Sequence, residues 1–324
     1  MSISNQDQSI HEQNESIAAN SLDQFASKLR ESGLIQRLIQ LAHDEDLAPE
    51  PGSAPHDWTG ELMFTQDQSA TAQLVLRQTG TIAGLAFVPD ILKVFVQADE
   101  QMVWTPSVHD GVRSSQGTVL GTLAGSSIAL VRIERTLLNL IARLSGIATT
   151  TREYVDLIAG NSVDICDTRK TTPGLRAFEK YAVRCGGGVS HRMGLYDALL
   201  VKDNHLAGLG QSAFQERVRG AAIKARKNSL SFVQVEVDTL VQLEWLLAME
   251  PGTCDLVLLD NMPPETLLAA VQMRTQANPS LKLEASGGVS AGSVVAIAET
   301  GVDRISIGAL THQAVSLDIG LDTP

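Results

Sequence analysis

The sequence has 324 residues, of which 44% are hydrophobic and 19% charged, enough for one large or two ordinary domains with a sizeable core. Its formal net charge of −12 argues against a nucleic-acid partner, because a general nucleic-acid binder needs a basic face to neutralise phosphates. An anionic small substrate stays open, since a local cationic cleft can lie inside an acidic shell. No apolar run approaches the roughly 20 residues of a membrane-spanning helix, so no membrane partner is expected.

Residues 1–20 are polar and acidic, and they contain no hydrophobic signal core. We expect a disordered tail there. The three cysteines, Cys166, Cys185 and Cys254, are far apart and show no CxxC spacing. This pattern disfavours a disulfide framework or a thiolate zinc site and fits a reducing compartment, so we expect a cytoplasmic protein.

The first part of the chain predicts a mixed α+β domain. Residues 22–41 have helical apolar spacing that Gly33 interrupts, so two short helices are expected. A Pro- and Gly-rich loop follows over 49–60. Alternating or β-branched runs then predict an antiparallel sheet with strands over 72–79, 81–88, 92–98, 101–106 and 117–125. A long helix is predicted from Ser127 toward Ile158, with Ser145-Gly146 as the candidate break point.

In the remaining sequence, short apolar runs alternate with helical stretches, which indicates βα units and a parallel sheet. The apolar runs are 163–168, 197–203, 231–238, 254–260, 281–286 and 303–308. The helical stretches include 211–228, 240–249, 264–276 and 291–300. An incomplete α/β barrel is the leading architecture, and a doubly wound open sheet is the alternative. No GxGxxG follows the first strand, which disfavours a dinucleotide-binding fold.

These patterns divide the chain into four segments. We expect a disordered polar tail over 1–20 and an N-terminal α+β sandwich domain over 21–136. A catalytic α/β barrel is expected over 137–310, followed by a C-terminal segment over 311–324.

Reactive or charged residues lie at the ends of nearly all the predicted barrel strands, and in a barrel such ends share the rim where active sites are built. Ser286-Gly287-Gly288 could be a simple turn before a helix. The glycines also let a backbone approach an anion, and a helix beginning near Ser290 would donate free N–H groups. Late barrel loops frequently bind phosphate, and Gly308-Ala309 could form the other half of that site.

Two acids follow neighbouring predicted strands. Glu236 and Asp260 could be solvated acids at strand ends. Their functional interpretation is that they bind ribose hydroxyls or Mg²⁺, because a sugar diphosphate brings hard oxygens and Mg²⁺ takes one or two protein carboxylates. Asp203 and Asp238 stay undecided.

A cationic set stands out in this acidic protein: Arg169, Lys170, Arg184, His191, Arg192 and Lys202. A charge run is usually a solvated face. Here the charges surround the segment CGGGVSHRMG between two predicted strands, and Gly186–Gly188 is a poor place for a regular helix. We therefore expect a loop folded over a ligand. His191 alone would more often be a structural histidine, but beside Arg192 it would complete an anion pocket.

Four stretches carry a family likeness: ERTLLNLIARLSGIATTT, DTRKTTPGLRAFEKYAVRCGGGVSHRMGLYDALLVKDNH, LEASGGVS and GVDRISIGALTH. They resemble the quinolinate phosphoribosyltransferase family, and the likeness extends from about Leu38 to the C-terminus. The family's Gly-Asp-x-Thr stands here as His56-Asp57-Trp58-Thr59, a change that concerns the geometry of that loop rather than the chemistry. The resemblance implies an N-terminal α/β sandwich and an incomplete C-terminal α/β barrel.

The implied activity is a pentosyl transfer from phosphoribosyl pyrophosphate to quinolinate with decarboxylation. Its products are nicotinate mononucleotide, pyrophosphate and carbon dioxide, within NAD biosynthesis, and Mg²⁺ is the implied cofactor. The resemblance also implies a homodimer, sometimes a larger assembly, with active sites shared between subunits.

The family's quinolinate-binding residues carry over onto matching positions. Arg135 of the ERT motif resembles the arginine that the neighbouring subunit donates to the substrate carboxylates. Arg169, His191 and Arg192 resemble the rest of the quinolinate pocket, and Thr168 resembles a residue that orients it.

The catalytic and phosphate-binding residues also match. Lys170 and Lys202 resemble lysines that face the reacting groups and the pyrophosphate. Glu236 and Asp260 resemble the acids that hold ribose and magnesium. The implied 5′-phosphate cradle consists of Ser286, Gly287, Gly288, Gly308 and Ala309.

Two other functions compete with this interpretation. A relative with the same fold could use nicotinate, or a compound linked to molybdenum transport, as the acceptor. A non-catalytic barrel could bind a phosphorylated sugar, but it would not need Arg135, Arg169, Arg192 and Lys202 together. The number of cationic residues favours a dicarboxylate.

Overall fold

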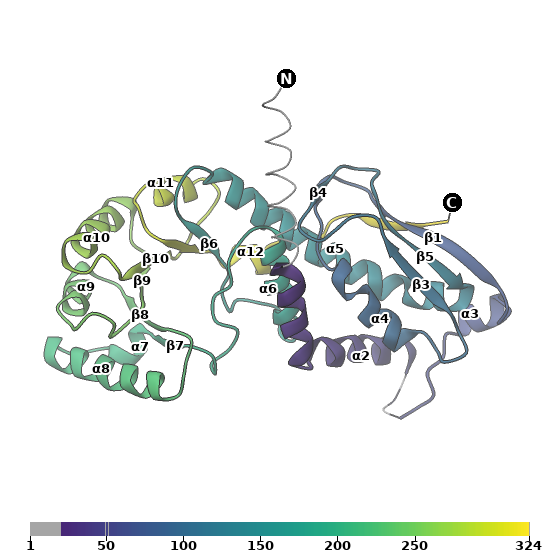
Figure 1. The fold of residues 1–324 in the computed structure, drawn as a ribbon, viewed down its shortest axis with the longest axis horizontal. Coiled ribbons are helices and arrows are strands. Elements are labelled where there is room, and N and C mark those ends of the chain that lie inside the picture. The colour runs from purple at the N-terminus through teal and green to yellow at the C-terminus, as the bar shows by residue number, and fades with distance from the viewer. Residues whose placement is uncertain (1–20, 49, 51, 324) are drawn as a thin grey trace, which may run out of the picture. The chain divides into compact units, whose positions relative to one another are not determined.

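The computed structural model describes residues 21–48, 50 and 52–323 (Figure 1). The chain divides into two compact units, which are described separately. The first unit contains the described residues up to Thr150, Thr172–Gly187 and the chain from Gln313 onward; the second contains Thr151–Thr171 and Gly188–His312. The two units thus interleave along the chain, whereas the predicted domain limits were continuous. The tail predicted over 1–20 lies outside the described residues.

An antiparallel sheet with the order β12-β1-β5-β3 forms the first unit's largest ladder. Its strands are β1 (Ser69–Leu76), β3 (Met102–Pro106), β5 (Val119–Ser126) and β12 (Ile319–Asp322). A second, two-stranded ladder joins β2 (Gly80–Thr81) to β4 (Arg113–Ser114). The strands predicted over 72–79, 101–106 and 117–125 are therefore confirmed. The short β12 was not predicted, because its four residues include a glycine and form no alternating apolar run.

Two predicted strands, over 81–88 and 92–98, were wrong. Most of these residues form the 3₁₀ turn η1 (Leu85–Phe87) and the helix α4 (Val88–Phe95). Pro89 stands in the first turn of α4, where its missing N–H costs no hydrogen bond. The buried apolar side chains of this helix repeat at helical spacing: Val88, Ile91 and Phe95. The β-branched residues of the run hid that spacing.

The N-terminal helices follow the predicted pattern. Gly33, with φ of +70°, separates a helix over 21–31 from α2 (Leu34–Leu47). The next helix is α3 (Trp58–Met63), and the Asp57 carboxylate caps it by accepting the N–H of Gly60 at 2.9 Å. His56 has no positive φ, so replacing the family's glycine there brings no backbone strain.

The long helix α5 (Ser127–Leu157) is continuous, so the break predicted at Ser145-Gly146 was wrong. The buried Ser145 hydroxyl accepts the N–H of Ala83 at 3.1 Å. A Cβ on Gly146 would lie 2.0 Å from the carbonyl oxygen of Val315. The two small residues therefore allow neighbouring segments to approach the helix and do not interrupt it.

The second unit contains six parallel strands in the order β6-β11-β10-β9-β8-β7. They are β6 (Asp164–Cys166), β7 (Leu199–Val201), β8 (Val233–Val237), β9 (Leu256–Asp260), β10 (Lys282–Ser286) and β11 (Arg304–Ser306). The order runs in sequence from β7 to β11, and the first strand then joins the last. This is a barrel open between β6 and β7, because a doubly wound sheet would place its first strand inside the sheet. The predicted incomplete α/β barrel is confirmed.

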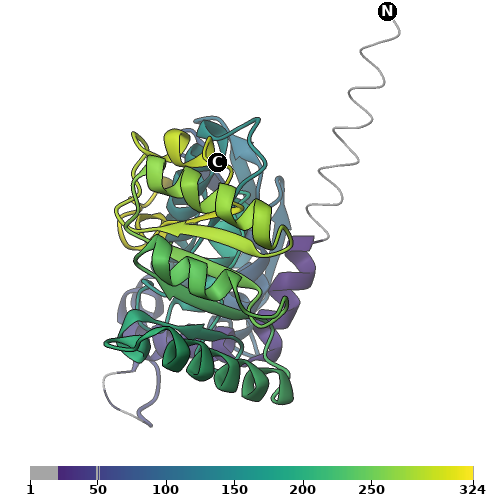
Figure 2. The ribbon, with the colours of Figure 1, turned by 90° about the vertical axis from the view of Figure 1, so that its left-hand side faces the viewer.

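Helices follow the strands of the second unit, as the sequence predicted. They are α7 (Asp203–Leu206), α8 (Gln211–Lys227), α9 (Leu240–Leu247), α10 (Pro264–Ala277), α11 (Val294–Ala298) and α12 (Ala309–His312). Figure 2 shows α8, α9 and α10 side by side in front of the strands. The helix that follows β6 along the chain, α6 (Arg176–Cys185), belongs to the first unit instead. The barrel opening thus falls where the second unit has no long helix of its own.

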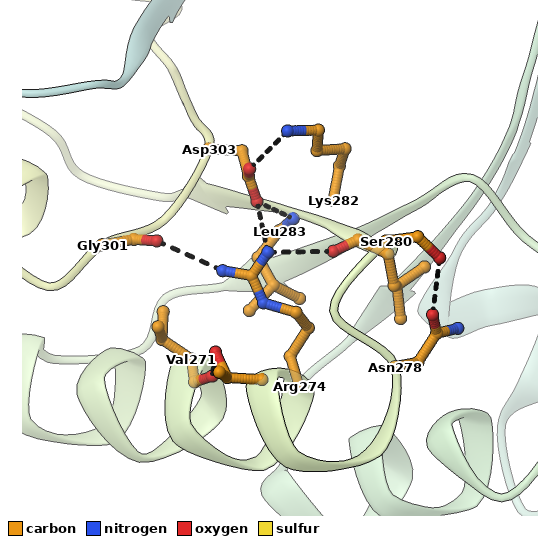
Figure 3. A network of polar contacts seen from close by, with 10 residues as sticks. Val271, Arg274, Asn278, Ser280, Lys282, Leu283, Gly301 and Asp303 are labelled. Carbon is orange, nitrogen blue, oxygen red and sulfur yellow. Dashed lines mark hydrogen bonds and ion pairs between the residues drawn. The ribbon is translucent and has the colours of Figure 1, made fainter.

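The N-terminal ends of β10 and β11 are joined by a polar network (Figure 3). Arg274 of α10 donates to the Leu281 carbonyl at 3.2 Å and to the Asp303 carboxylate at 3.3 Å. The Lys282 ammonium lies 2.8 Å from the same carboxylate. These contacts stabilise this edge of the sheet and leave the opposite, C-terminal edge to carry the predicted site. Among the described residues, no helix is long and apolar enough to cross a membrane.

Candidate active site at the C-terminal rim of the barrel

All predicted site residues except Arg135 belong to the second unit, at or just after the C-terminal ends of its strands or in the loop before β7. Parallel register places Asp260, the last residue of β9, directly beside Ser286, the last residue of β10. Arg135 lies on α5 in the first unit, with its side chain 68% exposed and 3.6 Å from the Glu134 carboxylate.

Two arginines form the cationic part of the rim. The Nε atoms of Arg169 and Arg192 are both buried and have no hydrogen-bond partner among the described residues. Burial lowers the pKa of Arg192, and the nearby charge of Arg169 lowers it further. Unsatisfied guanidinium N–H groups that repel each other fit a ligand with two negative charges.

The loop before β7 holds Arg192 in place. The Asp197 carboxylate accepts the backbone N–H groups of Met193 at 2.7 Å and Gly194 at 2.9 Å, which closes a tight turn. Arg192 Nη1 donates to the Ala198 carbonyl at 3.2 Å, just before β7. The glycine-rich segment therefore forms a loop, as predicted, and this loop fixes one end of the guanidinium.

His191 is buried. Its side chain is 7% exposed, and its Nε2 lies 2.7 Å from the Gln234 side-chain oxygen. Its Nδ1 accepts the backbone N–H of Arg192 at 2.7 Å. The backbone N–H of His191 donates to the Asp167 carboxylate at 2.8 Å. Both ring nitrogens thus contact the protein itself.

Lys170 is held by its backbone. Its N–H donates to the Thr168 hydroxyl at 3.0 Å, and its carbonyl accepts the Thr311 hydroxyl at 2.7 Å. A Cβ on Gly308 would lie 2.8 Å from Lys170 Cδ and 3.2 Å from His312 Nε2, so these two side chains flank the glycine. His312 stands four residues after Gly308, at the end of the short helix α12.

Carboxylates gather on the other side of the rim. Lys202 Nζ lies 3.3 Å from Glu236 Oε2. Burial raises the pKa of Glu236, Lys202 opposes that shift, and the charge of Asp260 adds to it. The pKa of Asp238 is also raised, first by burial and then by the charges of Asp203 and Asp260. These acids repel one another, which a cation would relieve.

The acidic side contains the two residues that the sequence predicted as Mg²⁺ ligands. Among the described residues, no group of three or more His, Cys, Asp or Glu side chains is placed to hold a metal ion. Mg²⁺ commonly takes only one or two protein carboxylates and completes its shell with phosphate and water. Glu236 and Asp260 could supply those two ligands.

The Ser286–Gly288 segment is a glycine loop at the end of β10. Gly287 has φ of +100°, and a Cβ there would lie 2.1 Å from the Asn261 side-chain oxygen. The space around a Cβ of Gly288 is open within 4 Å. The predicted helix near Ser290 begins only at Val294 and has five residues, so Ser290 precedes the helix.

Comparisons with known proteins agree with this geometry. Residues 57–145 match the family model "Quinolinate phosphoribosyl transferase, N-terminal domain", and residues 147–322 match its C-terminal domain. The chain is 45% identical to the nicotinate-nucleotide pyrophosphorylase [carboxylating] of Mycobacterium leprae over 82% of this chain and 90% of that protein. The corresponding probable enzyme of Bacillus subtilis is 42% identical, over 82% and 87%.

A solved structure also resembles this fold. The nicotinate-nucleotide pyrophosphorylase from Francisella tularensis has a TM-score of 0.77 and 34% identity, covering 90% of this chain and 96% of that one. The matches span both units and the whole candidate site. The chain belongs to the quinolinate phosphoribosyltransferase family.

Proposed function

We propose that this protein is a quinolinate phosphoribosyltransferase. It transfers phosphoribose from phosphoribosyl pyrophosphate to quinolinate and releases pyrophosphate and carbon dioxide, which yields nicotinate mononucleotide for NAD biosynthesis. The observation that carries the proposal is the pair of buried guanidinium Nε atoms, of Arg169 and Arg192, with no partner among the described residues. Family membership supports the same activity.

Quinolinate carries two adjacent carboxylates, and a guanidinium fork can bind a carboxylate through two parallel hydrogen bonds. Arg169 and Arg192 would hold the dianion and orient its ring nitrogen toward the ribose carbon. Thr168, whose hydroxyl accepts the Lys170 backbone N–H, would help to orient this pocket. Lys170 and Lys202 would act as compact positive charges near the reacting groups and the departing pyrophosphate.

The sugar diphosphate would occupy the opposite side of the rim. The Ser286–Gly288 loop and Gly308-Ala309 would bind the 5′-phosphate through backbone N–H groups. Glu236 and Asp260 would hold ribose hydroxyls and Mg²⁺. When bound, Mg²⁺ would neutralise charge on the pyrophosphate.

The chemistry follows from positioning and charge. The C1–O bond to pyrophosphate breaks, positive charge develops on the ribose ring, and the quinolinate nitrogen lone pair forms the new N–C1 bond. The resulting pyridinium nitrogen is an electron sink. The bond to the adjacent carboxylate then breaks, carbon dioxide leaves, and the ring carbon keeps the electron pair and takes a proton from water. No general base is required.

We also propose a homodimer with shared sites, in which Arg135 reaches the rim of the neighbouring subunit. The exposed guanidinium on α5 supports this role, since it is free to approach another chain. A cytoplasmic location fits the three buried cysteines, Cys166, Cys185 and Cys254, which form no disulfide in the described part of the chain.

The test is product release with purified protein, Mg²⁺ and phosphoribosyl pyrophosphate. Quinolinate labelled in the carboxylate next to the ring nitrogen should release labelled carbon dioxide and one pyrophosphate per turnover. Pyrophosphate release with nicotinate at a comparable rate would instead favour a nicotinate-using relative. Release of neither product, with the sugar diphosphate still bound, would indicate a binding protein.

A further inference from the structure

A layer of polar side chains lies beneath the candidate rim. Gln234 stands two residues before Glu236 on β8, and Glu284 stands two residues before Ser286 on β10. Alternation along a strand puts each pair on the same face of the sheet. Gln234 and Glu284 are both fully buried, where a barrel usually carries branched apolar side chains.

These two side chains converge on His191. Its Nε2 lies 2.7 Å from the Gln234 side-chain oxygen and 3.6 Å from Glu284 Oε1. Because Nδ1 accepts the Arg192 N–H, the ring proton must sit on Nε2, and Nε2 donates to Gln234. His191 is therefore the neutral Nε2–H tautomer, with the Phe232 ring edge-on at 5.6 Å.

Protonation of His191 would disrupt this arrangement in two ways. Nδ1 would become a donor facing the Arg192 N–H, which is also a donor. A third positive charge would also join Arg169 and Arg192, whose charges already repel. An ionised carboxylate beside Nε2 would favour that unwanted imidazolium.

Burial disfavours the ionised form of Glu284. Its two oxygens make no well-formed hydrogen bond with a described residue, and burial raises its pKa. Ser306, Arg304 and Gln234 oppose the shift in part, while Asp167 adds to it. A neutral carboxyl group next to Nε2 leaves the histidine uncharged.

We propose that Gln234 and Glu284 are positioning residues that fix His191 as its neutral Nε2–H tautomer, so that His191 fixes the Arg192 backbone and aims the guanidinium at a substrate carboxylate. This inference deepens the proposed function and rests on it. His191 then acts on the substrate through Arg192.

The first measurement is the ¹⁵N NMR spectrum of full-length protein labelled at histidine, with the His191 signals assigned by their loss in His191→Gln. The proton should stay on Nε2 from about pH 6 to 8, the range in which an ordinary histidine titrates. Titration of His191 in that range, or a proton on Nδ1, would overturn the proposal without any further variant.

The second measurement is quinolinate binding by calorimetry. Glu284→Gln keeps a neutral group of the same shape, so its Kd should stay within about threefold of wild type. Gln234→Leu removes the acceptor, so the Kd should rise tenfold or more and the tautomer signal should change, while the Kd for phosphoribosyl pyrophosphate stays unchanged. The matched control is Gln215→Leu, which loses the hydrogen bond from the Gln215 side chain on α8 to the Trp245 carbonyl on α9. This variant should leave both Kd values unchanged.

The outcomes separate the two proposals. A tenfold loss in Glu284→Gln would mean that the carboxylate pairs with an imidazolium, contrary to the proposal. An unchanged tautomer and Kd in Gln234→Leu would mean that the pair only fills the core. If wild-type protein binds no quinolinate, the proposed function fails, while the NMR spectrum still decides the tautomer.

Discussion

Replacing Arg192 by lysine tests whether the guanidinium shape, rather than its charge, binds the substrate. The buried Nε of Arg192 lacks a partner, and Nη1 is already held by the Ala198 carbonyl. Lysine keeps the positive charge but cannot present two N–H groups to one carboxylate. Hydrogen bonds to charged groups contribute roughly 1.5–3 kcal/mol, so we expect a loss of about 2 kcal/mol, or about 30-fold in the Kd for quinolinate.

The assay is calorimetric titration of quinolinate into each protein, with thermal unfolding measured in parallel. Arg226→Lys is the matched control, because Arg226 donates to both Asp255 oxygens at 2.7 and 2.8 Å, on α8 away from the rim. That variant also replaces a guanidinium by an ammonium and should keep the wild-type Kd. Quinolinate binding by Arg192→Lys within threefold of wild type would refute a bidentate carboxylate contact.

Three further predictions follow from other contacts. Glu236→Ala and Asp260→Ala should weaken calorimetric binding of phosphoribosyl pyrophosphate with Mg²⁺ far more than binding of quinolinate, and the reverse result would contradict the assignment. Arg135→Ala and Lys202→Ala should each be nearly inactive, yet equal co-refolded amounts should regain about a quarter of wild-type activity, since half of the random dimers are mixed and each has one intact site. If mass spectrometry confirms subunit exchange and no activity returns, Arg135 acts in the active site of its own subunit. Gly146→Ala should lower the free energy of unfolding, measured by urea denaturation, by about 1–3 kcal/mol, because the added methyl group overpacks the contact with Val315. An unchanged free energy of unfolding would mean that the segment around Val315 moves to make room for the methyl group.

The barrel was predictable because its signal is regular. The strands lie in short, mostly apolar runs, and the helices between them have ordinary lengths. The first unit gave a weaker signal, since α4 has as many β-branched residues as a strand. Two observations reveal that it is a helix: Pro89 in its first turn, and the burial of Ile91 in the structure. Gly146 could not be interpreted from the sequence for the same reason. It looks like a helix break until the structure shows the Val315 carbonyl packed against it.

The site residues expected from the sequence are those at strand ends, such as Arg169 and Asp260, and their roles stay predictions. Gln234 and Glu284 were missed because they lie inside apolar runs, where a polar residue looks like an exposed position in an alternating strand. The sequence could place His191 beside Arg192 but could not show that its ring is buried and that both ring nitrogens contact other residues. The role of each ring nitrogen of His191 depends on the tautomer, and the tautomer can be assigned only when the partners of both Nδ1 and Nε2 are known.

The pairing of β1 with β12 affects how the chain is made. Arg77, just after β1, forms an ion pair with Asp322 across 245 positions of sequence. During synthesis, the first unit cannot complete its sheet until β12 has left the ribosome, whereas every barrel strand has already emerged by then. Until then the edge of β1 carries unpaired backbone groups that could add a strand from another nascent chain. The barrel can therefore form first, and the N-terminal sheet is completed last.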